Sequence, residues 1–229
     1  MKNLVTDTSS SVCSVGLFED DNLIVKNELD NGKTHSENFM PLVEKTLNDA
    51  NMKLDDLDYI TVVVGPGSFT GIRIGVASCK AMAEVKNLKV VPIISLDLLA
   101  TNEIEKSKVI CSMIDARNNQ VYCGIYDEKI NKLEEYLADD IENVFVVLEK
   151  YDDISFVGDG AVLHRERISE KLTGKNIKFS ENNKQNAESL GIIAYKKINE
   201  NEFVDADSVV PVYLRKSQAE RMKDAKKDS

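Results

Sequence analysis

The chain has 229 residues, of which 42% are hydrophobic and 30% are charged. This length exceeds that of a common small domain and fits two compact lobes, each able to bury its own core. No stretch of about 18 uncharged apolar residues is present, which excludes a membrane-spanning helix. The first three residues lead straight into a strand-like run, without the apolar region or cleavage site of a signal peptide. We therefore expect a cytoplasmic protein with no membrane association.

The charge of the chain is strongly acidic, with 29 basic against 39 acidic residues and a formal net charge of −10. Such a chain repels nucleic acid unless basic groups gather on one face, so nucleic-acid binding by this chain alone is disfavoured. The segment 215–227 reverses this acidity with six basic residues. It is interpreted either as a solvated terminal helix or as a contact for an acidic partner surface or a nucleic-acid backbone.

Residues that bind metals are sparse. The two histidines, His35 and His164, fall in different predicted lobes, and HExxH is absent, so we expect no metal site. His35 stands at a predicted helix start, where a capping or surface role is usual. The cysteines form no CxxC pair, which argues against a zinc ribbon or a redox dithiol and favours reduced, buried thiols. They are Cys13, Cys79, Cys111 and Cys123.

The first part of the chain predicts three strands and a helix. Residues 4–25 alternate apolar and polar positions and are broken by two polar turns, which indicates three short antiparallel strands. Thr34 and Glu37 have capping-box spacing, so a helix should begin there. Its apolar positions recur at spacings of three, four and three, which predicts a one-sided stripe for packing on another helix. This stripe is Met40, Val43, Leu47 and Ala50.

The next elements predict the middle of a sheet. Residues 59–64 are almost all β-branched, as in a strand buried on both faces. After a glycine-rich turn, residues 72–86 read as a helix and residues 89–94 as a further strand. A helix over 96–106 should bridge the lobes.

A second set of elements follows. Its strands are predicted at 109–114, 120–126, 154–157 and 177–179, and its helices at 161–172 and 187–199. The chain is thus predicted to be α/β, with a first lobe at residues 1–103 and a second lobe at residues 104–229.

The glycine-rich run at residues 65–75 lies between a buried strand and a helix, where α/β proteins place anion sites. Its spacing is GxGxxxG, which fits neither the P-loop nor the dinucleotide template, and Pro66 removes one backbone donor. Asp7 comes before a hydroxyl-rich turn and is either a nucleotide-site or a turn-capping aspartate. The candidate phosphate-binding residues are Asp7, Thr8, Ser9, Gly65 and Gly67.

The helix after this run has a second interpretation. Gly71, Gly75 and Cys79 recur every four positions, so one face of the helix carries small side chains that project little from the backbone. Such a face admits another helix at close distance, as small residues do in membrane helices. Spacing and composition leave helix docking and ligand binding both open.

Four segments together resemble the TsaB family, also called YeaZ. They are GPGSFTGIRIG at residues 65–75, Asp7-Thr8-Ser9, His35-Ser36-Glu37 with Pro41, and VPVYLR at residues 210–215. Asp115 and Arg117 resemble the DAR segment of the same family. This pair is either a structural ion pair or a contact to the other lobe or to a partner. The match follows nearly the whole chain in order.

The resemblance implies an actin-like ATPase (ASKHA) fold, with two lobes each built on a βββαβα sheet unit. It implies a non-catalytic paralogue of TsaD that pairs with TsaD and recruits the ATPase TsaE. The complex supports formation of threonylcarbamoyl on adenosine 37 of tRNAs that read ANN codons, and tRNA is reached only through the complex. Pairing uses the first two helices, here the stripe from Met40 to Ala50 and the face of Gly71, Gly75 and Cys79. The same surface could pair two copies of this chain when TsaD is absent, because a self-complementary helix pair is a natural twofold contact. No cofactor is expected in the isolated chain, and ATP or ADP belongs to the complex.

Two alternatives from other classes stay open. A hydrolase of the glycoprotease-like kind would use Ser68, although GxSxG and HExxH are absent and no histidine is near it in sequence. An independent kinase of the actin-like fold would bind magnesium and ATP through Asp7.

Overall fold

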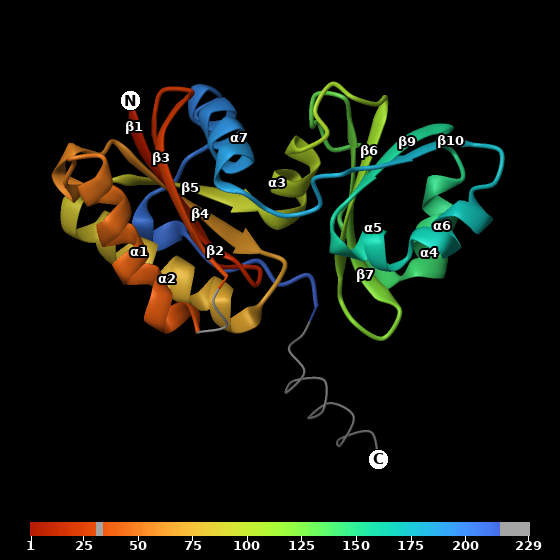
Figure 1. Cartoon of the computed structure of the whole chain (residues 1–229), viewed down its shortest axis with the longest axis horizontal. Helices are drawn as coiled ribbons and strands as arrows, with labels where there is room; N and C mark the ends of the chain where they lie inside the picture. Colours follow the sequence, from red (N-terminus) through yellow and green to blue (C-terminus); the bar gives the residue numbers. More distant parts are fainter. Residues whose placement is uncertain (31–33, 216–229) are drawn as a thin grey trace, which may run out of the picture.

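Two five-stranded mixed sheets lie side by side in the computed structural model, which describes residues 1–30 and 34–215 (Figure 1). The first sheet has the strand order β3-β2-β1-β4-β5, with β1 to β3 antiparallel and β4 and β5 parallel to β1. The three strands predicted in the first thirty residues are therefore confirmed. The strands are β1 Lys2–Asp7, β2 Cys13–Glu19, β3 Asn22–Leu29, β4 Tyr59–Gly65 and β5 Lys89–Ile94.

The second sheet repeats the first, in the order β10-β9-β6-β7-β8. Its strand β8 was not predicted, because it is short and two of its four residues are aspartates. The two sheets share one topology, a three-stranded meander extended by two parallel strands. The strands are β6 Val109–Asp115, β7 Gln120–Asp127, β8 Leu137–Asp140, β9 Asp153–Val157 and β10 Asn176–Phe179.

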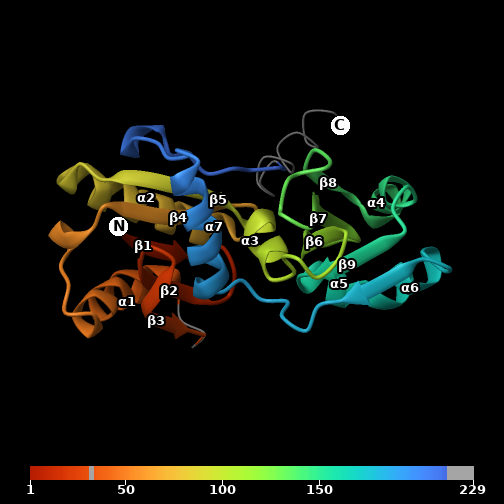
Figure 2. The same ribbon diagram turned by 90° about the horizontal axis from the view of Figure 1, so that it is seen from above.

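Helices cover both faces of the first sheet. Helices α1 (His35–Asp49) and α2 (Phe69–Lys86) lie against one face, and α7 (Ala187–Asn199) lies against the other (Figures 1 and 2). Helix α1 begins as the capping box predicts, since the Glu37 carboxylate accepts from the Thr34 amide at 3.2 Å and from the Thr34 hydroxyl at 2.8 Å. Single-turn 3₁₀ helices stand at Leu54–Asp56 and Ala206–Ser208.

The linking helix is shorter than predicted. Helix α3 is Ser95–Thr101, and the residues after it form turns rather than continuing to residue 106. The helix predicted at 161–172 is divided at His164 into two short helices. The helices of the second lobe are α4 Ile141–Leu148, α5 Asp159–Leu163 and α6 Arg165–Lys171.

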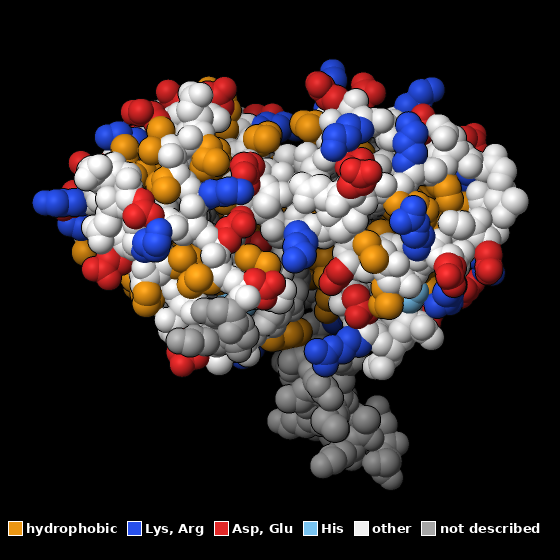
Figure 3. Space-filling view, in the orientation of Figure 1, with side chains coloured by type: hydrophobic (Ala, Val, Ile, Leu, Met, Phe, Trp, Pro, Cys, Tyr) orange, Lys and Arg blue, Asp and Glu red, His pale blue; other side chains and the backbone are white. Residues whose placement is uncertain are grey.

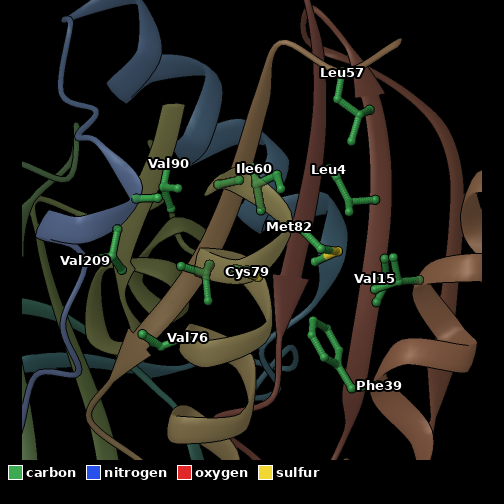
Figure 4. Packing of buried hydrophobic residues seen from close by; sticks show 14 of the residues in the cluster. Leu4, Val15, Phe39, Leu57, Ile60, Val76, Cys79, Met82, Val90 and Val209 are labelled. Atoms are coloured by element: carbon green, nitrogen blue, oxygen red, sulfur yellow. The ribbon is translucent and has the colours of Figure 1, made fainter. Parts of the chain in front are cut away.

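Apolar side chains of α1, α2 and the first sheet meet in one core, which Figure 4 shows from close by. Phe39 of α1 and Ile72 of α2 are almost entirely buried there, and so is Cys79. A second core fills the space between the second sheet and α4 to α6. Each lobe thus buries its own core, as the length of the chain suggested.

The division at residue 103 does not describe the lobes fully, because the chain returns to the first lobe. In α7, Leu190 and Ile193 pack with Val5 and Phe18 of the first sheet. The segment after α7 then forms a bridge with β5, donates from the Val212 amide to β4, and inserts into the first core. Residues 187–214 therefore belong to the first lobe. The helix predicted at residues 187–199 is therefore correct, but it belongs to the first lobe and not to the second lobe, where it was predicted.

Candidate functional site

The turn that comes after β1 lies between the lobes and is closed by its own side chains. Asp7 is 2% exposed, and its Oδ1 accepts from both the amide and the hydroxyl of Ser9, each at 2.7 Å. Burial raises the pKa of the Asp7 carboxyl above its ordinary value, although these hydrogen bonds act in the opposite direction. Asp7 therefore caps the turn in the way that aspartate commonly does.

The same turn is tied to the start of α2. The Ser9 carbonyl accepts from the Ser68 amide at 2.8 Å, and the Thr8 hydroxyl donates to the Gly71 carbonyl at 2.7 Å. The Ser9 hydroxyl also accepts from Gln185 at 3.1 Å, in the segment that returns from the second lobe. Thr8 and Ser9 are both almost completely buried.

The glycine turn packs against backbone rather than against open space. Gly65 has φ of +115°, which requires glycine, and a Cβ there would lie 2.6 Å from the Val212 carbonyl oxygen. A Cβ on Gly67 would collide with the Ser9 carbonyl. The structure thus brings the five candidate phosphate-binding residues together, but the chain's own backbone occupies the space around them. Their role in nucleotide binding stays a prediction.

Ser68 begins α2 as its N-cap, since its hydroxyl oxygen accepts from the Gly71 amide at 3.2 Å. The ring of His35 is engaged elsewhere, with its Nε2 2.8 Å from the Ser10 carbonyl oxygen. No base within residues 1–30 or 34–215 forms a hydrogen bond with the Ser68 hydroxyl. This geometry is that of a helix cap.

The small-residue face of α2 points inward, which corrects the expectation that it offers a groove. A Cβ on Gly71 would overlap the Thr8 carbonyl, and one on Gly75 would overlap the Thr8 hydroxyl. Cys79 is fully buried, and its Sγ lies 3.3 Å from the Thr6 hydroxyl. These positions are small because β1 and its turn approach the helix closely, so no partner helix reaches them.

The predicted stripe of α1 is also mostly covered. Val43 is 3% exposed in the first core, whereas Leu47 and Ala50 are half-buried against it. Met40 is the exposed member, at 46%. Apolar residues at spacings of three and four fit either of two neighbouring faces of one helix. The face that enters the core is centred on Phe39, one position before Met40, where the predicted stripe begins.

The two helices nevertheless expose other small and apolar side chains, which we call the outer face of α1 and α2. Val85 is 76% exposed, Ala77 and Ala81 are exposed, and Ile74 is half-buried. These positions recur at helical spacing on the side of α2 away from the sheet. The outer face comprises Met40, Ile74, Ala77, Ala81 and Val85.

The corresponding turn of the second lobe comes after β6, and its residues 117–119 are exposed to solvent. Oδ1 of Asp115 accepts from the Arg117 amide at 2.8 Å, and the two side chains form no ion pair. Arg117 is exposed and left-handed, with φ of +64°. At this turn, Arg215 makes a contact between the lobes, since its Nη1 donates to the Ala116 carbonyl at 3.2 Å. The interpretation as a structural ion pair is therefore wrong, and a partner contact of Arg117 stays a prediction.

Sequence reasoning missed the polar contacts that join the lobes behind this region. Oδ1 of Asp97, on α3, accepts from the hydroxyls of Tyr126 at 2.8 Å and Tyr136 at 2.6 Å. Glu103 is 6% exposed and accepts from Ser155 at 2.7 Å and Ser180 at 2.6 Å. A pocket of about 300 Å³ adjoins Asp97. A signal was available, because an acidic residue within the apolar run 94–100 needs a partner once it is buried.

The two histidines lie in different lobes, as predicted. Burial lowers the pKa of His164, and the nearby Arg167 acts in the same direction. Within the described residues, no cluster of three or more His, Cys, Asp or Glu side chains is placed to hold a metal ion.

No helix in residues 1–30 or 34–215 has the length and apolarity to cross a membrane. On the face in Figure 3, basic and acidic side chains are interspersed over both lobes. The basic tail beyond residue 215 lies outside the described residues.

Known proteins are similar to this chain in sequence and in architecture. Residues 29–223 match the family model described as TsaD, tRNA N6-adenosine threonylcarbamoyltransferase. The tRNA threonylcarbamoyladenosine biosynthesis protein TsaB of Bacillus subtilis (strain 168) is 33% identical over 227 residues, which cover 96% of each chain. The protein of that name from Haemophilus influenzae is 28% identical and covers 93% of this chain and 92% of its own.

Solved structures agree with these matches. YeaZ from Pseudomonas aeruginosa superimposes with a TM-score of 0.80 at 25% identity, over 93% of this chain and 99% of its own. ROK hexokinase from Thermus thermophilus gives a TM-score of 0.54 at 11% identity, over 87% of this chain and 100% of its own. At that identity the likeness shows the fold alone. The predicted actin-like fold is confirmed.

Proposed function

The chain belongs to the TsaB family of tRNA threonylcarbamoyladenosine biosynthesis proteins, and from this membership and the closed turns after β1 and β4 we propose that it is a non-catalytic scaffold subunit. It acts in the cytoplasm, pairs with a TsaD-type subunit and recruits a TsaE-type ATPase. The assembled complex forms threonylcarbamoyl on adenosine 37 of tRNAs that read ANN codons. This chain contacts tRNA through the complex, and ATP or ADP acts in the complex rather than in this chain.

The observation that carries the proposal is the closure of the two turns of the first lobe that come after β1 and β4. An actin-like kinase needs backbone amides free to meet phosphate. Here the Ser68 amide donates to Ser9, the Ser9 amide donates to Asp7, and glycines 65 and 67 face backbone carbonyls. The groups that would meet phosphate are engaged in holding the first lobe together.

Reconstitution tests the scaffold role. The TsaD-type subunit, the TsaE-type ATPase, threonylcarbamoyl-AMP and an ANN-decoding tRNA are incubated with and without this chain, and modified nucleoside is measured by mass spectrometry. Modification should require this chain, and this chain alone should give none. Full modification without it would refute the scaffold, and modification by this chain alone would make it the enzyme.

The outer face of α1 and α2 is the proposed site for the TsaD-type subunit. It is apolar, exposed and on the first two helices, whereas the inward-facing positions predicted from sequence are closed. Ala81→Arg should abolish co-purification with the TsaD-type subunit, because a guanidinium and its stem would not fit a packed helix contact. Val146→Arg is the matched control, since Val146 is 66% exposed on α4 of the second lobe and should leave binding intact. Equal binding by both variants would place the interface elsewhere.

The same face is proposed to pair two copies when the TsaD-type subunit is absent. A face built on two neighbouring helices can meet itself about a twofold axis. Light scattering after size-exclusion chromatography should give a dimer for the parent chain and a monomer for Ala81→Arg. A dimer that survives Ala81→Arg would assign the self-contact to another surface.

A further inference from the structure

The side chain of Arg73, on α2, is held at the edge of the outer face by Tyr213. Its Nε donates to the Tyr213 hydroxyl at 2.8 Å, and its Cζ lies 5.5 Å from the centroid of the Tyr213 ring. The Tyr213 ring stacks on Phe69 at 4.6 Å with an interplanar angle of 7°. An arginine with one nitrogen bonded and its plane near an aromatic ring has few rotamers left.

Tyr213 is itself fixed by the segment that returns from the second lobe. The Lys80 ammonium donates to the Asp207 and Val209 carbonyls at 3.0 and 3.2 Å. The Val212 amide then donates to the Val64 carbonyl at 2.8 Å, directly before Tyr213. The guanidinium of Arg73 is thus positioned by a segment bound along its length to the first lobe.

The guanidinium has no anion to bind within the described part of the chain. Arg73 is exposed, and no carboxylate among residues 1–30 and 34–215 lies within ion-pair distance of it. Its two terminal nitrogens donate to no described residue, although the chain as a whole has a net charge of −10. An arginine presents a planar fork of donors that matches a carboxylate with two parallel hydrogen bonds.

We propose that Arg73, held by Tyr213, is the charged anchor of the outer face of α1 and α2 and pairs with a carboxylate of the partner protein. This rests on the proposed function, because the partner is the TsaD-type subunit that the outer face binds. Preorganisation by Tyr213 means that little side-chain entropy remains to be lost on binding. Arginine and tyrosine are also residue types that dominate interface energetics.

The surroundings favour a carboxylate on a protein over a phosphate of tRNA. A nucleic-acid surface needs several basic groups on one face, because affinity comes from neutralising many phosphates. The two helices expose Glu44, Asp49 and Glu84 as well as basic residues, and Lys45 and Lys86 are already paired with Asp49 and Asp55. A single arginine next to small apolar side chains fits a protein surface with one acidic residue.

The test measures the dissociation constant between this chain and the TsaD-type subunit at low and at moderate salt. Arg73→Ala should weaken binding by about 10- to 100-fold and make the dissociation constant less sensitive to salt. Arg73→Lys keeps the charge but loses the fork, so an intermediate loss is expected. Tyr213→Phe keeps the ring and removes the hydroxyl that accepts from Nε, and a loss of a few-fold is expected.

The matched control is Arg165→Ala, on α6 of the second lobe. Arg165 is also exposed, lacks an ion pair in the described part of the chain, and lies 4.6 Å from the centroid of Phe179. Its variant should bind the TsaD-type subunit as the parent does. Melting temperatures confirm that each variant is folded. If Arg73→Ala has a lowered melting temperature, the dissociation constant of Arg73→Lys is used instead to test the anchor.

The outcomes separate the two proposals. No binding by the parent chain would refute the proposed function. Parent-like binding by both Arg73 variants would overturn only the anchor. A loss of tRNA binding by the reconstituted complex, with an unchanged constant for the TsaD-type subunit, would also overturn it, because Arg73 would then bind a phosphate.

Discussion

The turns after the first strand of each sheet occupy equivalent places in the two lobes, yet one is buried and the other is open. In the first lobe, Thr8 and Ser9 are tied to α2 and almost completely covered. In the second lobe, residues 117–119 are exposed and all three are left-handed. The two sheets have the same strand order, so topology does not cause the difference.

The difference lies in the segment between each inner parallel strand and its next helix. After β4, the glycines of residues 65–75 allow α2 to approach the first turn within backbone distance. After β9, Gly158 and Gly160 bring the start of α5 against β6 instead, and the tip of the second turn is left in solvent. Burial of the first turn therefore depends on glycine at positions where no Cβ fits, and this dependence can be measured.

The largest effect is expected at Gly71. In Gly71→Ala the new Cβ would overlap the Thr8 carbonyl oxygen, which is backbone and cannot rotate away. The free energy of unfolding, measured with urea, should fall by about 3 kcal/mol, as in severe overpacking. The control is Gly174→Ala, where φ is +90° but no atom lies within 4 Å, and where only backbone strain of about 1 kcal/mol is expected. Equal losses of unfolding free energy in both variants would mean that the turn after β1 shifts to make room for the new Cβ at no cost.

A smaller effect is expected at Asp7, which tests whether burial of the turn disfavours a charge there. The raised pKa means that the folded state binds the Asp7 proton more tightly than the unfolded state does. The contribution to stability is therefore fully present below the unfolded pKa and is lost as the pH rises through the folded pKa.

Asp7→Asn should remove this pH dependence, because its Oδ1 still accepts from the amide and hydroxyl of Ser9. At pH 7 the variant should be more stable than the parent, because burial disfavours the charged carboxylate but not the neutral amide. Well below the ordinary aspartate pKa of about 3.9, the two should have the same stability, since Asp7 is then protonated in both states. A variant that is less stable than the parent at pH 7 would show that the ionised carboxylate stabilises the turn.

The strands and the start of α1 were predictable, because alternation and the Thr34–Glu37 pair are local signals. The inward direction of α2 was not, since Gly71, Gly75 and Cys79 suit close packing against any backbone. Sequence spacing cannot say whether that backbone belongs to this chain or to a partner. The actual neighbour, the carbonyl of Thr8, lies 63 positions away in sequence.

The return of α7 to the first sheet was hidden for a similar reason. Its apolar period shows a buried face, but Leu190 meets Phe18 only because the chain crosses between lobes after β10. The anchor Arg73 was hidden as well. Its partner Tyr213 stands 140 positions away, and only the path of the returning segment brings the two side chains together.

The smallest effect is expected in the open turn of the second lobe. Arg117 is left-handed, a conformation that costs a residue with a Cβ about 1–2 kcal/mol. In Arg117→Gly this strain is relieved, while the greater freedom of glycine in the unfolded chain offsets part of the gain, so the free energy of unfolding should rise by about 0.5 kcal/mol. Arg117→Ala keeps the Cβ and loses the guanidinium, so its stability should stay near that of the parent. If Arg117→Ala gains as much as Arg117→Gly, the cost lies in the charge of Arg117 rather than in its backbone, and the two turns differ in electrostatics as well as in burial.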